Sequence, residues 1–315
     1  MTEAQGEVFD LGYRRYEGPR EGRWRARKAL WTNGVRTALG IGRPWGAKVL
    51  PAFLFIAVMI PALIVSIAVT PIGVDDPGLL GHDGYYQIVS VILILFSAII
   101  APELLCPDRR DGVISLYLVR PMTATDYVAA RWLAFFTVTL VIVLTGQVVM
   151  FIGLVLAAPE PLEYVKDNWL DVPRFMLAGL VVAVFTTTVP LAVSAFTTRR
   201  AYAASFVIGL FIISFPVAGI LSLCDEETVT VQNGQEIVVS KDCEPATGDA
   251  AKWYALLNVG QVPSFVNDLI FPGDTDEDFA KVVAELPDAV PVGWYLILTL
   301  GPGFALWRRY GRIRV

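Results

Sequence analysis

Six apolar segments interrupt an otherwise polar chain, and each approaches the length needed to cross a bilayer. They cover residues 49–70, 86–105, 132–157, 175–198, 201–223 and 291–307, of which the last is the shortest. A helix that crosses about 30 Å of hydrocarbon needs roughly 20 mostly apolar residues, because an unpaired backbone amide there costs several kcal/mol. The pattern therefore predicts an all-α polytopic membrane protein with six transmembrane helices.

The charged residues alternate in sign between successive connections. The segment 1–48, the connection 103–131, the turn at Arg199 and Arg200 and the tail after residue 307 hold 20 of the 25 basic residues. The other connections hold 21 of the 30 acidic residues. Because Lys and Arg are in excess in cytoplasmic connections, both termini are expected in the cytoplasm. The chain then divides into a cytoplasmic segment 1–48, spans 49–223, an outer subdomain 224–290, and a last span with a basic tail, 291–315.

The predicted spans contain hydroxyl side chains and one amide but almost no ionisable group. Transporters driven by protons or sodium ions usually have ionisable groups at membrane depth, so this class is disfavoured. Most hydroxyls are expected to pack between helices and to bond to the preceding turn. The alternative is that some of them line a polar pathway, and the candidates for that lining are Thr145, Gln147, Thr187, Ser194 and Ser214.

Residue types used in catalysis, metal binding or nucleotide binding are not clustered in the sequence. The single histidine, His82, is expected to be a solvated loop residue, and no phosphate loop of the form GxxxxGKS or GxxxxGKT is present. No catalytic, cofactor-binding or metal-ligating residue is therefore assigned. If the protein uses ATP and Mg²⁺, another subunit is expected to bind them.

The connection 103–131 is compact and amphipathic. Apolar residues such as Val113 and Leu116 alternate with the charged run 108–111, which is typical of a short helix lying at a membrane face. Gly112 and Pro121 interrupt it, and the run from Thr123 to Asp126 is expected to cap the helix that follows. This layout suits a fixed cytoplasmic projection to which another protein binds; the alternative is an ordinary connector at the membrane interface.

At this connection the sequence resembles the permease subunits of ABC-2-type ABC transporters. Those proteins often have, after the second span, a glutamate, a charged cluster, a glycine, an apolar stretch, Arg-Pro or Ser-Pro, and a basic residue that opens the third span. The matching residues here are Glu103, Asp108 to Gly112, Leu116, Leu118, Arg120, Pro121, Asp126, Tyr127 and Arg131. Val113 and Arg131 depart from the usual Thr and Lys. The run 13–20 also resembles the start of smaller permeases of this class.

The resemblance implies a fold and a set of partners. The connection would be a coupling helix that docks on a separate ABC ATP-binding subunit, through Asp108, Arg109, Arg110, Asp111, Gly112, Arg120 and Pro121. A second permease half, identical or related, would complete the transporter, which would be an exporter in the plasma or inner membrane. Residues 23–45 would form an amphipathic elbow helix along the inner leaflet. Physics supports that placement, because each basic residue near an anionic leaflet gains roughly 1 kcal/mol; no nucleic-acid partner is expected.

The outer segment 224–290 is acidic and contains a predicted β-hairpin. Its β-branched arms, 228–232 and 235–239, flank Asn233 and Gly234, the preferred residues of a two-residue turn. The same register sets Cys224 opposite Cys243. A disulfide between them is expected in an oxidising outer compartment, the alternative being two free thiols, and Cys106 is expected to stay a thiol. The moderately apolar run 255–271 is predicted to be re-entrant or to lie on the surface.

Taken together, these patterns predict the permease subunit of an ATP-driven exporter. One alternative is a secondary transporter or channel that works without ATP. Another is a membrane anchor or sensor subunit whose outer domain binds a ligand without moving it. The cargo is left open by the sequence, because apolar spans lined by hydroxyls suit lipids, hydrophobic drugs, peptides and glycans alike.

Overall fold

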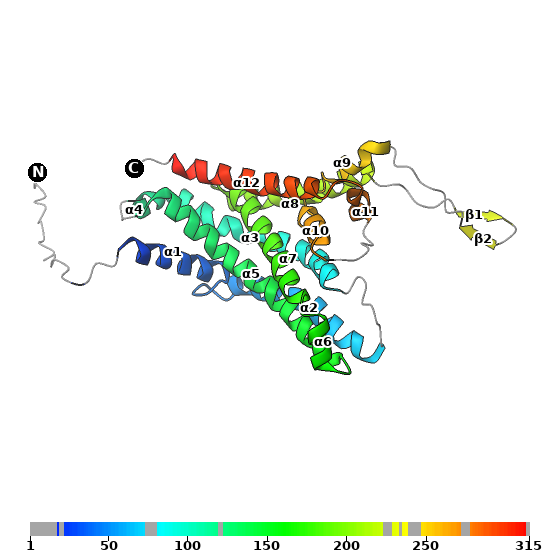
Figure 1. Cartoon of the computed structure of the whole chain (residues 1–315). Coiled ribbons are helices and arrows are strands. Elements are labelled where there is room, and N and C mark those ends of the chain that lie inside the picture. Colours follow the sequence, from blue (N-terminus) through cyan, green and yellow to red (C-terminus); the bar gives the residue numbers. More distant parts are fainter. Residues whose placement is uncertain are drawn as a thin grey trace, which may run out of the picture.

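The structure is a computed structural model that describes Gly18 and residues 22–72, 81–118, 122–222, 229–232, 235–238, 247–271 and 278–312. Long helices form a bundle, and shorter ones lie at its two ends (Figure 1). The helices are α1 (Arg23–Ala38), α2 (Gly46–Ile72), α3 (His82–Arg110), α4 (Ile114–Leu118), α5 (Ala124–Ala157), α6 (Pro161–Asp167), α7 (Asp171–Ser194), α8 (Arg200–Ser222), α9 (Ala251–Ala255), α10 (Val262–Asp268), α11 (Asp278–Ala284) and α12 (Ala289–Gly311). A short 3-10 helix (Gly248–Ala250) and two strands, β1 (Val229–Gln232) and β2 (Gln235–Val238), complete the described elements.

Six of the described helices are long and apolar enough to cross a membrane. Their apolar stretches are Lys48–Ile67 in α2, Gly84–Arg110 in α3, Ala124–Ala157 in α5, Asp171–Ser194 in α7, Arg200–Ser222 in α8 and Ala289–Gly311 in α12. Each overlaps one of the six predicted spans. The all-helical membrane architecture predicted from the sequence is therefore confirmed for the described part of the chain.

The helices extend further than the apolar pattern does, and the connection predicted at 103–131 is mostly helical. α3 continues to Arg110 and α5 already begins at Ala124, which leaves only α4 and short turns between them. The apolar pattern marks only the part of a helix that contacts lipid. The helix itself can continue beyond the hydrocarbon for as long as its backbone hydrogen bonds are formed. α5, with 34 residues, is about 50 Å long, so its charged first turns need not lie within a hydrocarbon core of roughly 30 Å.

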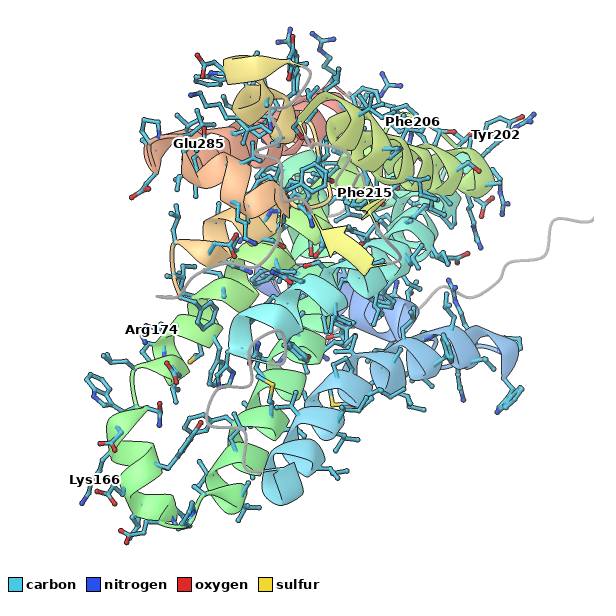
Figure 2. All side chains as sticks on the ribbon, turned by 90° about the vertical axis from the view of Figure 1, so that its right-hand side faces the viewer. Lys166, Arg174, Tyr202, Phe206, Phe215 and Glu285 are labelled. Atoms are coloured by element: carbon cyan, nitrogen blue, oxygen red, sulfur yellow. The ribbon has the colours of Figure 1, made fainter. Side chains whose placement is uncertain are left out.

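α3 and α7 form the centre of the bundle. Their most apolar stretches are each 67% buried, compared with 17% for α8 and 22% for α12. α7 packs against α3, α5 and α12. On α8, by contrast, the aromatic side chains of Tyr202 and Phe206 point away from the bundle (Figure 2). Apolar surface of this extent is stable only against lipid or a partner protein, as expected for a membrane-spanning bundle.

Most hydroxyls within the bundle bond to the turn that precedes them, as the sequence predicted. Each donates to the carbonyl oxygen four residues earlier; at Thr186 and Val182, for example, the distance is 2.7 Å. The same bond is formed by Ser66, Ser90, Ser97, Thr137, Thr139, Thr145, Thr188, Ser194 and Ser222. These groups therefore satisfy their hydrogen bonding inside their own helices and do not need water.

α1 packs along the first third of α5 and runs in the same direction. The contact is close at Gly34, where an added Cβ atom would lie 2.6 Å from the Cβ of Ala134. Three residues earlier, the Trp31 indole donates a 3.3 Å hydrogen bond to the hydroxyl of Thr137 on α5. Glycine at position 34 is therefore required by the approach of two backbones, a common device between membrane helices.

The segment 255–271 is an inward-facing part of the bundle. Val262 and Phe265 of α10 are buried, and α10 packs against α7 and α12. The Trp294 indole of α12 donates a 2.9 Å hydrogen bond to the carbonyl of Leu256. Of the two predicted placements, re-entrant or lying on the surface, the buried residues disagree with the second, because the apolar side chains of α10 pack against α7 and α12; the re-entrant placement stays a prediction.

β1 and β2 pair antiparallel. Val229 is opposite Val238 and Gln232 is opposite Gln235, which is the register that a two-residue turn at positions 233 and 234 requires. The turn residues themselves, and Cys224 and Cys243, lie outside the described residues. The disulfide between those cysteines therefore stays a prediction.

The two ends of the bundle carry different small elements. One end, called the α4 end below, holds the start of α1, helix α4 and the end of α12 (Figure 1). The opposite end, called the α9 end, holds α9 and α11. The residues that the sequence analysis assigned to coupling are at the α4 end.

Candidate functional site

The predicted coupling residues lie where α3 ends, before the short turn into α4. Asp108, Arg109 and Arg110 form the last turn of α3, and Asp111 follows as its C-cap. Gly112 has a φ of +67°, a left-handed conformation that residues with a side chain rarely adopt, and it separates α3 from α4. Arg120 and Pro121 lie outside the described residues, so their part in this site remains a prediction.

Asp108 is a buried anchor between α3 and α5. Its carboxylate accepts a 2.6 Å hydrogen bond from the Tyr127 hydroxyl and forms a 2.6 Å ion pair with Arg131. The side chains of Arg131 and Asp108 are only 4% and 13% exposed. Tyr127 also stacks near Tyr310 of α12, with ring centroids 5.5 Å apart. Asp108 therefore ties the end of α3 to α5 and, through Tyr127, to the last turns of α12.

Arg109 also points inward. Its guanidinium donates to the backbone carbonyl of Ala195, and to that of Thr197 at 3.5 Å, in the turn between α7 and α8. The thiol of Cys106, one turn earlier, is buried against the same turn and is a free thiol as predicted. The α7–α8 turn is thus held against the end of α3 by side chains from α3.

Two further carboxylates at the α4 end are each held by two arginines. Asp126 pairs with Arg23 at 2.6 Å and with Arg27 at 2.5 Å, both from α1. The Asp126 carboxylate also accepts from the backbone amide of Thr123, whose hydroxyl in turn accepts from the amide of Asp126. This capping box lies within the run 123–126, where a cap was predicted, and the two ion pairs of Asp126 join α1 to the first turn of α5.

Glu103 joins two other segments of the chain through ion pairs with two arginines. It pairs with Arg43 at 2.8 Å, in the connection between α1 and α2, and with Arg200 at the start of α8. The sequence analysis quoted Glu103 and Asp126 as parts of a motif but did not predict their partners. The alternation of charge predicted one side of the membrane for these groups, yet no spacing rule pairs residues about 60 to 100 positions apart.

Only part of the predicted coupling set is accessible. Arg110 and Asp111 are 62% and 51% exposed and pair with each other at 2.9 Å. The hydrogen bond from Arg110 holds the pKa of the Asp111 carboxyl below its ordinary value, so it stays ionised near neutral pH. Ser115 is exposed, and Leu116 is 66% exposed on α4. We call these four residues the α4 knob; they form a small amphipathic projection on a rigid base.

The structure places the candidate pathway residues on α5, α7 and α8. Thr145, Ser194 and Ser214 bond to carbonyls of their own helices. Thr187 is buried, and its hydroxyl has no hydrogen-bond partner among the described residues. None of these four residues, nor Gln147, lines either of the grooves described below.

His82 is buried, so the prediction of a solvated loop residue is wrong. It is 9% exposed at the start of α3, and its Nδ1 lies 2.6 Å from the amide oxygen of Gln147. The Gln147 amide nitrogen donates at 2.9 Å to the His82 carbonyl. The ring stacks on Phe175, with centroids 5.5 Å apart. Gln147 therefore serves helix packing, and its bond with His82 accounts for an amide within a span.

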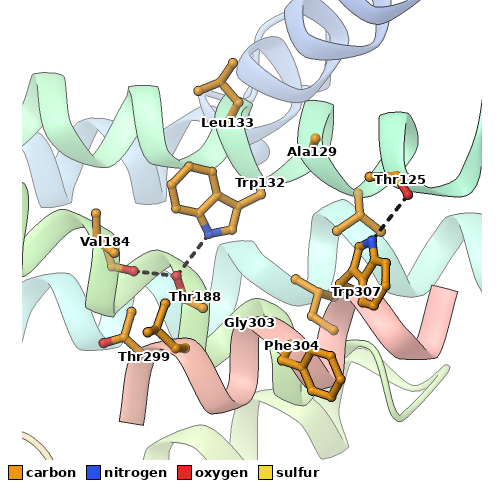
Figure 3. Close-up of a pocket in the computed structure, with 13 residues that line it drawn as sticks. Thr125, Ala129, Trp132, Leu133, Val184, Thr188, Thr299, Gly303, Phe304 and Trp307 are labelled. Carbon is orange, nitrogen blue, oxygen red and sulfur yellow. Dashed lines mark hydrogen bonds between the residues drawn. The ribbon is translucent and has the colours of Figure 1, made fainter. Parts of the chain in front are cut away.

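Two open grooves flank the exposed edge of α5 at the α4 end. The larger, about 740 Å³, lies between α5, α7 and α12 (Figure 3). Two indoles point into it and are hydrogen-bonded to threonines: Trp132 to Thr188 at 3.0 Å, and Trp307 to Thr125 at 3.3 Å. The smaller groove, about 560 Å³, lies between α1 and α5. Both are lined mainly by apolar side chains.

The described residues do not assemble a metal centre. No three His, Cys, Asp or Glu side chains in this part of the chain lie close enough together to hold a metal ion. The carboxylates Glu103, Asp108 and Asp126 are instead each paired with arginine. The charged groups of this site therefore form ion pairs that hold helices together, and the exposed α4 knob lies beside them.

The comparison with protein families decides what kind of membrane protein this is. The family model of the ABC-2 family transporter proteins matches residues 53–304. The chain belongs to this family. A comparison with curated proteins finds no match. The match in this ABC-2 family protein spans α3, α4 and the start of α5, so the paired carboxylates and the α4 knob lie within the family region, whereas α1 lies outside it.

Proposed function

We propose that the chain is the membrane-spanning permease subunit of an ATP-driven ABC exporter. The observation that carries the proposal is the α4 knob, an exposed group of charged and apolar side chains in an ABC-2 family protein. It lies beside the largely buried ion pair between Asp108 and Arg131, which ties α3 to α5. A separate ABC ATP-binding subunit would bind the knob and supply ATP and Mg²⁺. This chain would contribute no catalytic residue and no cofactor site.

The buried and exposed members of the predicted coupling set would have different roles. Arg110 and Asp111, with Leu116, would contact the ATP-binding subunit, because they are accessible. Asp108 and Arg109 would position the knob, because their side chains bond to α5 and to the α7–α8 turn. A movement of the knob would then be transmitted to α5, α7 and α8 at once, which is what coupling to a pathway requires.

The proposal includes an orientation. The α4 end would face the cytoplasm with both termini, since the basic residues gather there, and the outer subdomain 224–290 would face the other side. α1 would act as the elbow at the inner leaflet, with its exposed basic side chains at headgroup level. A reporter fused after residue 315 would be active in the cytoplasm, and one inserted between residues 233 and 234 would be active outside.

A second permease half, identical or related, would complete the pathway. Much of the apolar surface of α8 and α12 is exposed and is available to a second half. Within one half, α3 and α7 pack at the centre of the bundle, so the pathway would lie between the two halves. Of the five candidate pathway residues, we retain Thr187 as the proposed lining, because its hydroxyl bonds to no described residue, whereas the other four are already hydrogen-bonded.

Copurification tests the proposal. The tagged protein, purified in mild detergent from its native membrane, is expected to bring down an ABC ATP-binding subunit. Arg110→Glu combined with Leu116→Asp is expected to lower that yield at least tenfold, because it reverses a charge and places a carboxylate at the apolar tip. Lys166→Glu, an exposed charge reversal on α6 far from α4, is the matched control and should leave the yield unchanged.

Two results would overturn the proposal. The first is full retention of the ATP-binding subunit by the folded double variant. The second is substrate transport in sealed vesicles that neither needs ATP nor responds to vanadate, which is the behaviour of a secondary transporter or channel.

A further inference from the structure

α1 carries a stripe of aromatic and basic side chains along the groove between α1 and α5. Trp24, Arg27, Lys28 and Trp31 are spaced three, one and three residues apart, so they share one face of the helix. All four line the smaller groove. Trp24 is 74% exposed, while Trp31 is half-buried and bonded to Thr137. We call these four residues the α1 stripe.

The opposite wall of the groove belongs to α5 and is mainly apolar. Ala129, Ala130 and Leu133 form this wall, with Thr125 and Asp126 at its α4 end. Leu133 is 47% exposed, and Ala129 is exposed as well. Because α5 is a membrane helix, this wall continues into the surface that faces lipid. The groove is therefore polar and basic at one end and open to hydrocarbon at the other.

The polar end has an excess of positive charge. Asp126 is already bound by Arg23 and Arg27. Lys28 is exposed and forms no ion pair with any described residue, and the Arg27 side chain is 38% exposed beside its ion pair with Asp126. Arg23, Arg27 and Lys28 thus place three positive charges at an end of the groove that holds one carboxylate, and Arg27 and Lys28 line the groove where an anion can reach them.

We infer that the groove binds one anionic phospholipid, with its phosphate at Arg27 and Lys28 and an acyl chain along Ala129 and Leu133. Basic residues attract anionic headgroups, and indoles favour the headgroup level, which together match the α1 stripe. A protein partner fits less well, because the apolar wall leads into the bilayer. The inference rests on the proposed orientation only for assigning the lipid to the inner leaflet; binding in detergent does not depend on it.

The test measures lipid binding to the full-length protein by native mass spectrometry. The protein is stripped of lipid in detergent and titrated with phosphatidylglycerol, with phosphatidylcholine of the same acyl chains, or with inorganic phosphate. One phosphatidylglycerol per chain is expected to bind at least tenfold more tightly than phosphatidylcholine. Inorganic phosphate should not compete at millimolar concentration, since it lacks the acyl chain.

Two variants and one control locate the lipid. Lys28→Glu is expected to weaken phosphatidylglycerol binding about tenfold, because a favourable charge becomes a repulsive one. Ala129→Trp is expected to abolish the specific site by filling the groove from an exposed position. Arg36→Glu changes the same charge on the same helix but does not line the groove, so it should alter the affinity less than twofold.

The inference would be wrong if Lys28→Glu and Arg36→Glu weakened binding equally, since the attraction would then be only the general charge of α1. It would also be wrong if the two lipids bound alike, or if Ala129→Trp left lipid binding intact but disrupted a dimer of the chain; the groove would then be an interface between two copies. None of these results bears on copurification of the ATP-binding subunit, so the two proposals fail separately.

Discussion

Replacing Asp108 with alanine should destabilise the protein strongly although the residue lies beside an exposed knob. The substitution removes the partner of Arg131, whose side chain is 4% exposed, and the acceptor of the Tyr127 hydroxyl. The guanidinium of Arg131 would be left buried without a counter-charge, because its side chain has no other ion-pair partner among the described residues.

The magnitude follows from burial. Removing one partner of a buried ion pair costs about 3–5 kcal/mol, because the other charge stays out of water without compensation. A buried hydroxyl that loses its acceptor costs about 1–3 kcal/mol, but the two losses share one carboxylate and are not additive. Asp108 is 13% exposed, so some water can reach the site, and we expect about 3–4 kcal/mol in total.

The assay is reversible unfolding in mixed micelles, titrated with a denaturing detergent and followed by tryptophan fluorescence. Asp108→Ala is compared with Arg131→Met and with the double variant. The double variant should be less destabilised than the sum of the single variants by at least 2 kcal/mol, because both charges leave together. Arg110→Ala, two residues away and 62% exposed, is the control and should have little effect.

The reasoning is refuted if Asp108→Ala unfolds at the same detergent concentration as Arg110→Ala. It is also refuted if the single variants add without coupling. Either result would mean that the carboxylate is hydrated and that α3 is not anchored to α5 through it. A destabilised Asp108→Ala that still binds the ATP-binding subunit would support the separation of positioning residues from contact residues.

Three further perturbations probe other parts of the molecule. Gly34→Leu should cost about 1–3 kcal/mol in the same unfolding assay, because α1 must move off α5, whereas Gly209→Leu, where an added Cβ meets nothing within 4 Å, should be neutral. Gln147→Leu should cost about 1–3 kcal/mol by leaving the polar groups of His82 without their partner, and Gln147→Glu should preserve more of the stability. The two cysteines flanking the hairpin should react with maleimide only after reduction, and losing their disulfide should cost about 3 kcal/mol; reaction without reductant would show free thiols.

Part of the candidate site was predictable from the sequence. The charged run at 108–111, the left-handed glycine after it and the capping box at Thr123 are local features, and a local pattern is enough to identify them. Their assignment to one side of the membrane followed from the alternation of charge. The prediction treated Asp108 and Arg110 alike, however, and only the packing shows that one is an internal anchor and the other is accessible.

The predictions that were wrong or incomplete have one physical cause in common, which is a packing partner from a distant part of the chain. His82 sits in a polar, acidic run, so its surroundings in sequence indicate a loop, but α3 begins there and Gln147 of α5 lies beside it. The run 255–271 was predicted to be re-entrant or to lie on the surface, and only its contacts with α7 and α12 show that apolar side chains of α10 are buried in the bundle. In both cases the deciding partner comes from a distant part of the chain.

The sequence by itself determined the class of fold. A segment that crosses hydrocarbon alone satisfies its backbone hydrogen bonds by forming a helix, and such a helix needs about 20 consecutive apolar residues, which are directly recognisable in a sequence. It also predicted which connections share a side of the membrane, because the excess of Lys and Arg in alternate connections can be read directly from the sequence. Only the tertiary structure decided which charges are paired, which hydroxyls are satisfied and where the grooves lie. Those properties depend on contacts between helices, and lipid-facing and helix-facing apolar residues look the same in a sequence.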